Sequence, residues 1–168
     1  MYLGLLNALI GCENTIVKVP VSPYPISEDA FSVDTIADGF VIPYGIAIVN
    51  DKEYFITDRI GKLFHFKNEH QIEIQGIPSV KTFGDKGIPA IMHGGLMDVS
   101  LHPKFNINSW MYISYLDTDG FAKVSRFKIQ NNKTVQFETI FKTRSQNYYG
   151  NGMRIVWEDD THFFQVML

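Results

Sequence analysis

Short runs of apolar residues separated by polar turns fill the chain from Phe31 onward. Three compact runs span residues 45–49, 53–57 and 62–66, and the next segment, Gln71–Ile74, alternates polar and apolar side chains. That alternation is the period of a half-buried outer strand, and the runs are rich in aromatic and β-branched residues. No segment shows a sustained helical period. The pattern therefore predicts an all-β chain.

The same order of strands recurs further along the chain. The recurring segments are 95–101, 110–115, 122–129 and 134–141. A third set begins near residue 152, so the sets start at Gly45, Gly95 and Gly152. Units of four short strands that repeat roughly every 50 residues are typical of β-propeller blades. A β-sandwich with coincidentally similar hairpins is the alternative interpretation.

The repeat predicts how the chain is divided. We expect a partial β-propeller over residues 39–168, with blades near 40–80 and 95–143 and a third blade begun at 152. Propellers typically have 4–8 blades. Because the chain stops inside what reads as a strand, we expect a fragment with about two and a half blades.

The first residues resemble a bacterial lipoprotein signal. Leu9-Ile-Gly-Cys12 follows a short apolar run, although no Lys or Arg precedes that run. This pattern predicts a signal over residues 1–12, with Cys12 lipidated and retained as the first mature residue. The alternative is a buried cysteine in a short apolar strand. The signal implies export to the bacterial cell envelope, as a periplasmic or outer-membrane lipoprotein held to the membrane by its lipid.

A proline-containing segment over residues 13–38 follows the cysteine. Three prolines lie between Pro20 and Pro25. Proline cannot donate to a strand ladder, so we expect an extended tether that leads into the first extended segment.

Composition narrows the classes of function. The chain has 168 residues, 45% hydrophobic and 20% charged, which excludes wholesale disorder. Its formal net charge of −3 argues against a nucleic-acid partner. The single cysteine excludes an internal disulfide and a multi-cysteine zinc site.

Two motifs carry a resemblance to a known family. The first is Pro43-Tyr-Gly-Ile-Ala-Ile48, followed by Thr57-Asp-Arg-Ile-Gly-Lys-Leu63. The second, longer and more specific, is His93-Gly-Gly-Leu-Met-Asp-Val-Ser-Leu-His-Pro-Lys-Phe105. From residue 38 onward the chain resembles the glucose/sorbosone dehydrogenases, which are soluble quinoproteins with a six-bladed β-propeller fold.

The resemblance implies a chemistry. In that family a histidine removes the proton from the C1 hydroxyl of a sugar while hydride passes to pyrroloquinoline quinone, and calcium polarises the quinone. The resemblance therefore implies an exported oxidoreductase that acts on a sugar, with quinone and calcium as cofactors. The sugar and the electron acceptor are not defined by it. We expect most cofactor ligands beyond Leu168, no metal ligands within the chain, and an inactive fragment when the chain stands alone.

The resemblance also points to site residues. A glutamine of the family falls on His93, whose imidazole can still bind cofactor or substrate; the alternative is a histidine that only satisfies backbone groups. Arg154 matches a family arginine, and the alternative is a strand-face residue that pairs with a neighbouring blade. The family's histidine is missing from the stretch that begins at Asn147, and Tyr148 is its most natural replacement. A phenol with a reference pKa near 10 is a poor base at neutral pH.

Other candidate residues are read as structural. His102-Pro103 reads as a turn, Asp98 as a structural residue of its motif, and Asp117–Gly120 as a hairpin turn without the glutamate of a calcium loop. A non-catalytic, ligand-binding propeller that has lost the histidine is therefore the alternative function. A lactonase-type hydrolase is a third class, but its early metal-binding glutamate has no clear candidate here.

Overall fold

The computed structural model describes residues 35–83, 93–146 and 152–165. The chain divides into two units, residues 1–38 and 39–168, and every strand of the described residues belongs to the second. The signal-like segment around Cys12 lies outside the described residues, as does most of the predicted tether. No helix in the described part of the chain is long and apolar enough to cross a membrane.

The first sheet is a four-stranded antiparallel meander. Its strands follow chain order and are β1 (Pro43–Asn50), β2 (Glu53–Asp58), β3 (Lys62–Lys67) and β4 (His70–Glu73). Short turns join them, so that neighbours in sequence are also neighbours in the sheet. Phe55 and Leu63 are buried on the side that faces the second sheet's cluster of apolar residues.

The second sheet repeats this arrangement. Its strands are β7 (Leu96–Leu101), β8 (Met111–Leu116), β9 (Ala122–Gln130) and β10 (Lys133–Lys142), again antiparallel and in chain order. Every residue of β8 is buried, as expected for a strand covered on both faces. β10 at the edge is largely exposed.

Three smaller elements complete the described residues. β5 (Thr82–Phe83) pairs with β6 (His93–Gly94), and β11 (Ile155–Trp157) pairs with β12 (Phe163–Gln165). The one helix among the described residues, α1 (Phe105–Asn108), is a single turn that ends at Ser109 in the left-handed conformation. The sequence pattern did not predict the β5–β6 hairpin or α1, because both are too short to show a period.

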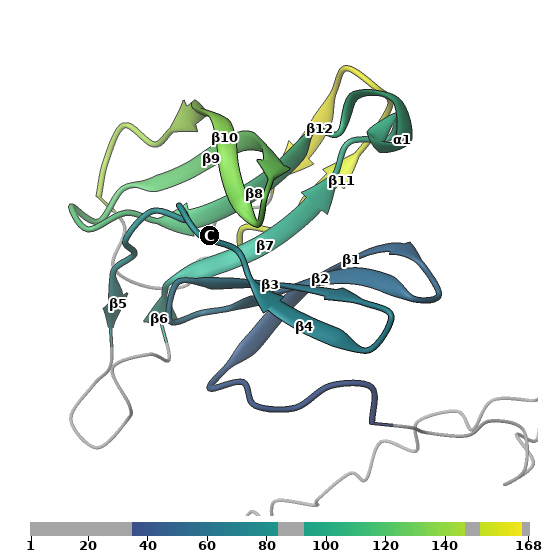
Figure 1. Ribbon diagram of the computed structural model, residues 1–168. Coiled ribbons are helices and arrows are strands. Elements are labelled where there is room, and N and C mark those ends of the chain that lie inside the picture. The colour runs from purple at the N-terminus through teal and green to yellow at the C-terminus, as the bar shows by residue number, and fades with distance from the viewer. Residues whose placement is uncertain (1–34, 84–92, 147–151, 166–168) are drawn as a thin grey trace, which may run out of the picture. The chain divides into compact units, whose positions relative to one another are not determined.

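β7 lies between β1 and β11 and forms the centre of the unit (Figure 1). β1 and β7, the first strands of the two sheets, run side by side in the same direction. Gly45 faces Met97 and Asp98 near the starts of the two strands, and Val49 and Leu101 line one pocket near the ends of the same strands. The largest apolar cluster fills the space between the two four-stranded sheets and includes Ala47, Phe55 and Val99.

A buried hydroxyl bridges each pair of neighbouring sets. Thr57 on β2 accepts a hydrogen bond from Gly45 N at 2.8 Å and donates to the Met97 carbonyl at 2.6 Å. Ser114 on β8 accepts from Asp98 N at 3.1 Å and donates to the Met153 carbonyl at 2.6 Å. The same device thus ties each second strand to the first strand of its own set and to that of the next.

These bonds fix which residues are equivalent in the repeat. They place Gly45, Asp98 and Arg154 at the same position of three successive first strands. The predicted correspondence of Gly45 with Gly95 is therefore wrong by three residues. The spacing of the glycines gave the wrong equivalence because Gly95 is needed for a different reason, its close contact with the backbone of Arg59.

Candidate functional site

Residues from the first part of each family-like motif meet where β1, β7 and β11 begin. Tyr44 precedes Gly45 on β1, Gly94 and Gly95 precede β7, and Arg154 precedes β11. The Tyr44 hydroxyl donates to the Gly152 carbonyl at 3.3 Å, a contact between segments more than a hundred residues apart. The starts of these three strands define the candidate site.

The glycine pair of the second motif is required by close backbone approach. Gly94 and Gly95 have φ angles of +70° and +92°, a region that other residues rarely adopt. A Cβ on Gly94 would lie 2.5 Å from the Lys81 carbonyl oxygen, and one on Gly95 would overlap the Arg59 carbonyl oxygen. Gly94 therefore lets the chain pass against the residue before β5, and Gly95 lets the start of β7 pass against the turn between β2 and β3.

That turn carries an anchored arginine. Arg59 donates from Nε to the Gly94 carbonyl at 2.9 Å, and its guanidinium lies 5.3 Å from the centroid of the Tyr44 ring. Burial lowers the pKa of Arg59, which still remains a cation at neutral pH. The preceding residue, Asp58, is buried and accepts hydrogen bonds from Val41 N and Ile42 N at 2.7 and 3.0 Å.

Asp98 is a second fully buried acidic group of the site, besides Asp58. Only 1% of its surface is exposed, and its Oδ2 accepts a hydrogen bond from Ile155 N at 2.8 Å. Its Oδ1 has no hydrogen-bond partner, although the Arg154 guanidinium approaches it to 3.6 Å. Burial raises the pKa of Asp98, and the bond from Ile155 and the charge of Arg154 only partly oppose this rise.

Arg154 is the one predicted site residue whose side chain the structure places here. Its side chain is 56% exposed and presents a cation at the start of β11. The backbone of His93 pairs with Phe83 in the β5–β6 hairpin, but its side chain lies outside the described residues. Tyr148 and Cys12 also lie outside them.

Sequence reasoning missed the contributions of Tyr44 and Arg59 and the partners of Asp98. The first two stand inside quoted motifs, so the signal was present. The sequence could not show that the Arg59 guanidinium lies over the Tyr44 ring. The sequence predicts a structural role for Asp98, and the structure adds that this residue joins β7 to the start of β11.

The turn-forming interpretations are confirmed. Asp117 accepts hydrogen bonds from Asp119 N and Phe121 N and pairs with Lys123, which closes the hairpin between β8 and β9. His102 Nδ1 accepts a hydrogen bond from Lys104 N at 2.9 Å. Within residues 35–83, 93–146 and 152–165, no three His, Cys, Asp or Glu side chains gather as a metal site would need.

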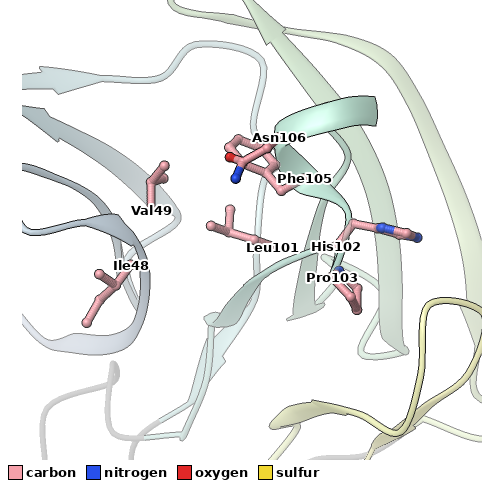
Figure 2. Close-up of a pocket in the computed structure, with 7 residues that line it drawn as sticks. All are labelled: Ile48, Val49, Leu101, His102, Pro103, Phe105 and Asn106. Carbon is pink, nitrogen blue, oxygen red and sulfur yellow. The ribbon is translucent and has the colours of Figure 1, made fainter.

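A separate pocket lies at the other ends of the strands, where β1 and β7 finish (Figure 2). Its volume is about 210 Å³, and its lining includes Ile48, Val49, Leu101 and Phe105. Figure 2 shows the His102 ring turned away from Val49. The pocket contains none of the motif residues that meet at the strand starts, so it is a different region from the candidate site.

The repeated sheets and their bridging hydroxyls define a β-propeller, of which the described residues form two blades and one hairpin of a third. This confirms the predicted fold class. A sequence model of the glucose/sorbosone dehydrogenases matches residues 40–167, so the chain belongs to that family.

Individual relatives are similar to part of this chain. An uncharacterized protein of Synechocystis sp. is 28% identical over 132 residues, which cover 74% of this chain and 32% of the relative. The apo-form structure of the soluble aldose sugar dehydrogenase from Escherichia coli is 26% identical with a TM-score of 0.62, over 75% of this chain and 37% of that one.

A further structure shows the same fold. The PQQ-bound aldose sugar dehydrogenase from Streptomyces coelicolor has a TM-score of 0.65 and 18% identity, over 79% of this chain and 40% of that one. The chain thus spans only about a third of the length of the relatives described first.

Proposed function

We propose that this chain is the N-terminal part of an exported quinoprotein that oxidises an aldose at C1 with hydride transfer to pyrroloquinoline quinone. The observation that carries the proposal is the meeting of both family motifs at one end of the first strands, where Arg59 donates to the Gly94 carbonyl and Arg154 lies 3.6 Å from Asp98. The aldose sugar dehydrogenases among the relatives, one of them PQQ-bound, support the substrate class and the cofactor.

The cationic groups of the site fit an anionic quinone. Pyrroloquinoline quinone carries carboxylates, and a guanidinium matches a carboxylate in charge and in its fork of donors. Arg154 is exposed, and its one acidic contact in the described residues is with a carboxylate that is itself buried. When bound, the quinone supplies a two-electron acceptor. We propose that Arg154 and His93 help hold it and that calcium ligands and further quinone contacts follow Leu168.

The alternative is a propeller that binds a ligand without catalysis. One observation favours it: residues 147–155 contain no histidine where the family has its base. Tyr148 at that position would be almost wholly protonated at neutral pH and could not efficiently take the C1 hydroxyl proton.

Titration of the intact protein with quinone and calcium, followed by an assay of aldose oxidation with a dye acceptor, separates the two functions. The proposed enzyme binds the quinone and turns over sugar. Quinone or sugar binding without turnover supports the alternative, and binding of neither contradicts both.

We also propose that the protein is a lipoprotein of the bacterial cell envelope. The proposal rests on Leu9-Ile-Gly-Cys12 after a short apolar run. Mass spectrometry of the protein from its host should find Cys12 lipidated at the mature N-terminus, and Cys12→Ser should abolish processing. An unmodified Cys12 with residues 1–11 retained would overturn this proposal.

A further inference from the structure

Asp98 touches all three first strands of the described unit. Its own strand is β7, its Oδ2 accepts the Ile155 backbone hydrogen of β11, and its Oδ1 packs against Gly45 of β1. A Cβ added to Gly45 would lie 2.8 Å from Oδ1, so the absence of a side chain there makes room for the carboxylate. One buried group therefore fixes the spacing of three segments from different parts of the sequence.

The repeat shows why this arrangement is specific. Gly45, Asp98 and Arg154 hold equivalent positions, but the first has no side chain, the second a buried carboxylate and the third an exposed guanidinium. A structural repeat alone would not require an acid followed by a base. Among these three equivalent positions, Asp98 and Arg154 are the neighbours that carry opposite charges, and they meet at the boundary between β7 and β11.

Only one of the two Asp98 carboxylate oxygens has a hydrogen-bond partner. A buried carboxylate oxygen without a hydrogen bond is costly, and Oδ1 is such an atom. An apolar residue would remove this cost, but it would also take away the acceptor that Oδ2 offers to Ile155 N. The cation that faces Oδ1 is Arg154, at 3.6 Å, and no other ion pair with Asp98 occurs among residues 35–83, 93–146 and 152–165.

We infer that Asp98 is a positioning residue, which holds the Arg154 guanidinium and the start of β11 in place for an anionic ligand at the strand starts. The inference rests on the proposed function, which supplies the quinone carboxylate as that ligand. Asp98 itself is too buried to touch it. Its influence on binding passes through Arg154.

The test is a double-mutant cycle on quinone binding by the intact protein. Asp98→Asn keeps the shape and an acceptor for Ile155 N but removes the charge opposite Arg154, and Arg154→Gln removes the guanidinium. The matched control is Asp160→Asn, because Asp160 pairs with Lys104 and also joins the second blade to the β11–β12 hairpin, at the other end of the strands.

Two measurements are made on each variant: the dissociation constant for pyrroloquinoline quinone in the presence of calcium, and the melting midpoint of the protein without quinone. We expect Arg154→Gln to weaken binding at least about tenfold, with little change in the midpoint, since the side chain is exposed. Asp98→Asn should weaken binding by a similar factor, and the double variant should be no weaker than either. Asp160→Asn should stay within about twofold of the wild type.

A second route tests the same contact if Asp98→Asn folds poorly. Gly45→Ala places a methyl group against Oδ1 and should weaken quinone binding in the wild type but not in the Arg154→Gln background. Penalties that multiply, or an Asp98→Asn variant that melts lower but binds quinone normally, would overturn the inference and leave the proposed function standing. A wild-type protein that binds no quinone would overturn both.

Discussion

The hydroxyl of Thr57 offers a sharp test of how neighbouring blades are joined. It is fully buried, accepts from Gly45 N at 2.8 Å and donates to the Met97 carbonyl at 2.6 Å. Thr57→Val keeps the shape of the side chain and replaces the hydroxyl with a methyl group. A buried donor on one strand and a buried acceptor on the next would then both lose this partner.

The expected loss follows from these two groups. Leaving a buried polar group unsatisfied costs about 1–3 kcal/mol, so the variant should lose about 3 kcal/mol of unfolding free energy. Thr57→Ser is the matched control, because it keeps the hydroxyl and deletes one methyl group, at a cost of about 1 kcal/mol. Ser114→Ala should repeat the effect at the next boundary, since Ser114 makes the equivalent bonds.

Urea unfolding of the intact protein measures the effect through the midpoint and the slope. The account predicts that Thr57→Val is clearly less stable than Thr57→Ser. If Thr57→Val matches the wild type to within about 0.5 kcal/mol, the hydroxyl does not join the blades energetically and the reasoning fails.

Two further predictions concern single positions. Gly95→Ala should lower the melting midpoint far more than Gly39→Ala. Both glycines have positive φ angles, but of the two only Gly95 faces a carbonyl oxygen, that of Arg59. Equal losses in the two variants would refute this role of Gly95. At Asp117, burial raises the pKa, but hydrogen bonds led by that from Lys123 outweigh it and lower the pKa. Its stabilising contribution is therefore present above the unfolded pKa, about 4, and lost as pH falls through the lower folded value. In acid-unfolding experiments, Asp117→Asn should therefore lose less stability than the wild type as the pH falls. A variant with the same pH profile as the wild type would contradict this prediction.

Local pattern was sufficient to predict the β architecture. Strand period and turn residues predicted the all-β chain, and the hairpin at Asp117 follows from local turn chemistry. The same local view misread the repeat, since it paired Gly45 with Gly95 when the equivalent residue is Asp98. A backbone glycine can be needed for a turn, a close approach or a missing side chain, and the sequence does not distinguish these uses.

The site depends on contacts that no local pattern contains. The bond from Ile155 N to Asp98 and the bond from Tyr44 to the Gly152 carbonyl join residues far apart in sequence. Their existence follows from how the first strands lie side by side, which the period of each strand leaves undefined. The family resemblance supplied Arg154 as a candidate, and the structure supplied its buried partner.

Oxidation of an aldose at C1 can be measured in a single turnover of the loaded protein. The intact protein, loaded with calcium and pyrroloquinoline quinone, is mixed with an aldose without oxygen, and the sugar product is identified by mass spectrometry. We expect one lactone per bound quinone, formed more slowly when C1 carries deuterium, because the C1–hydrogen bond breaks in the hydride transfer. Bound quinone with unchanged sugar would contradict the proposed oxidation and leave a propeller that only binds its ligands.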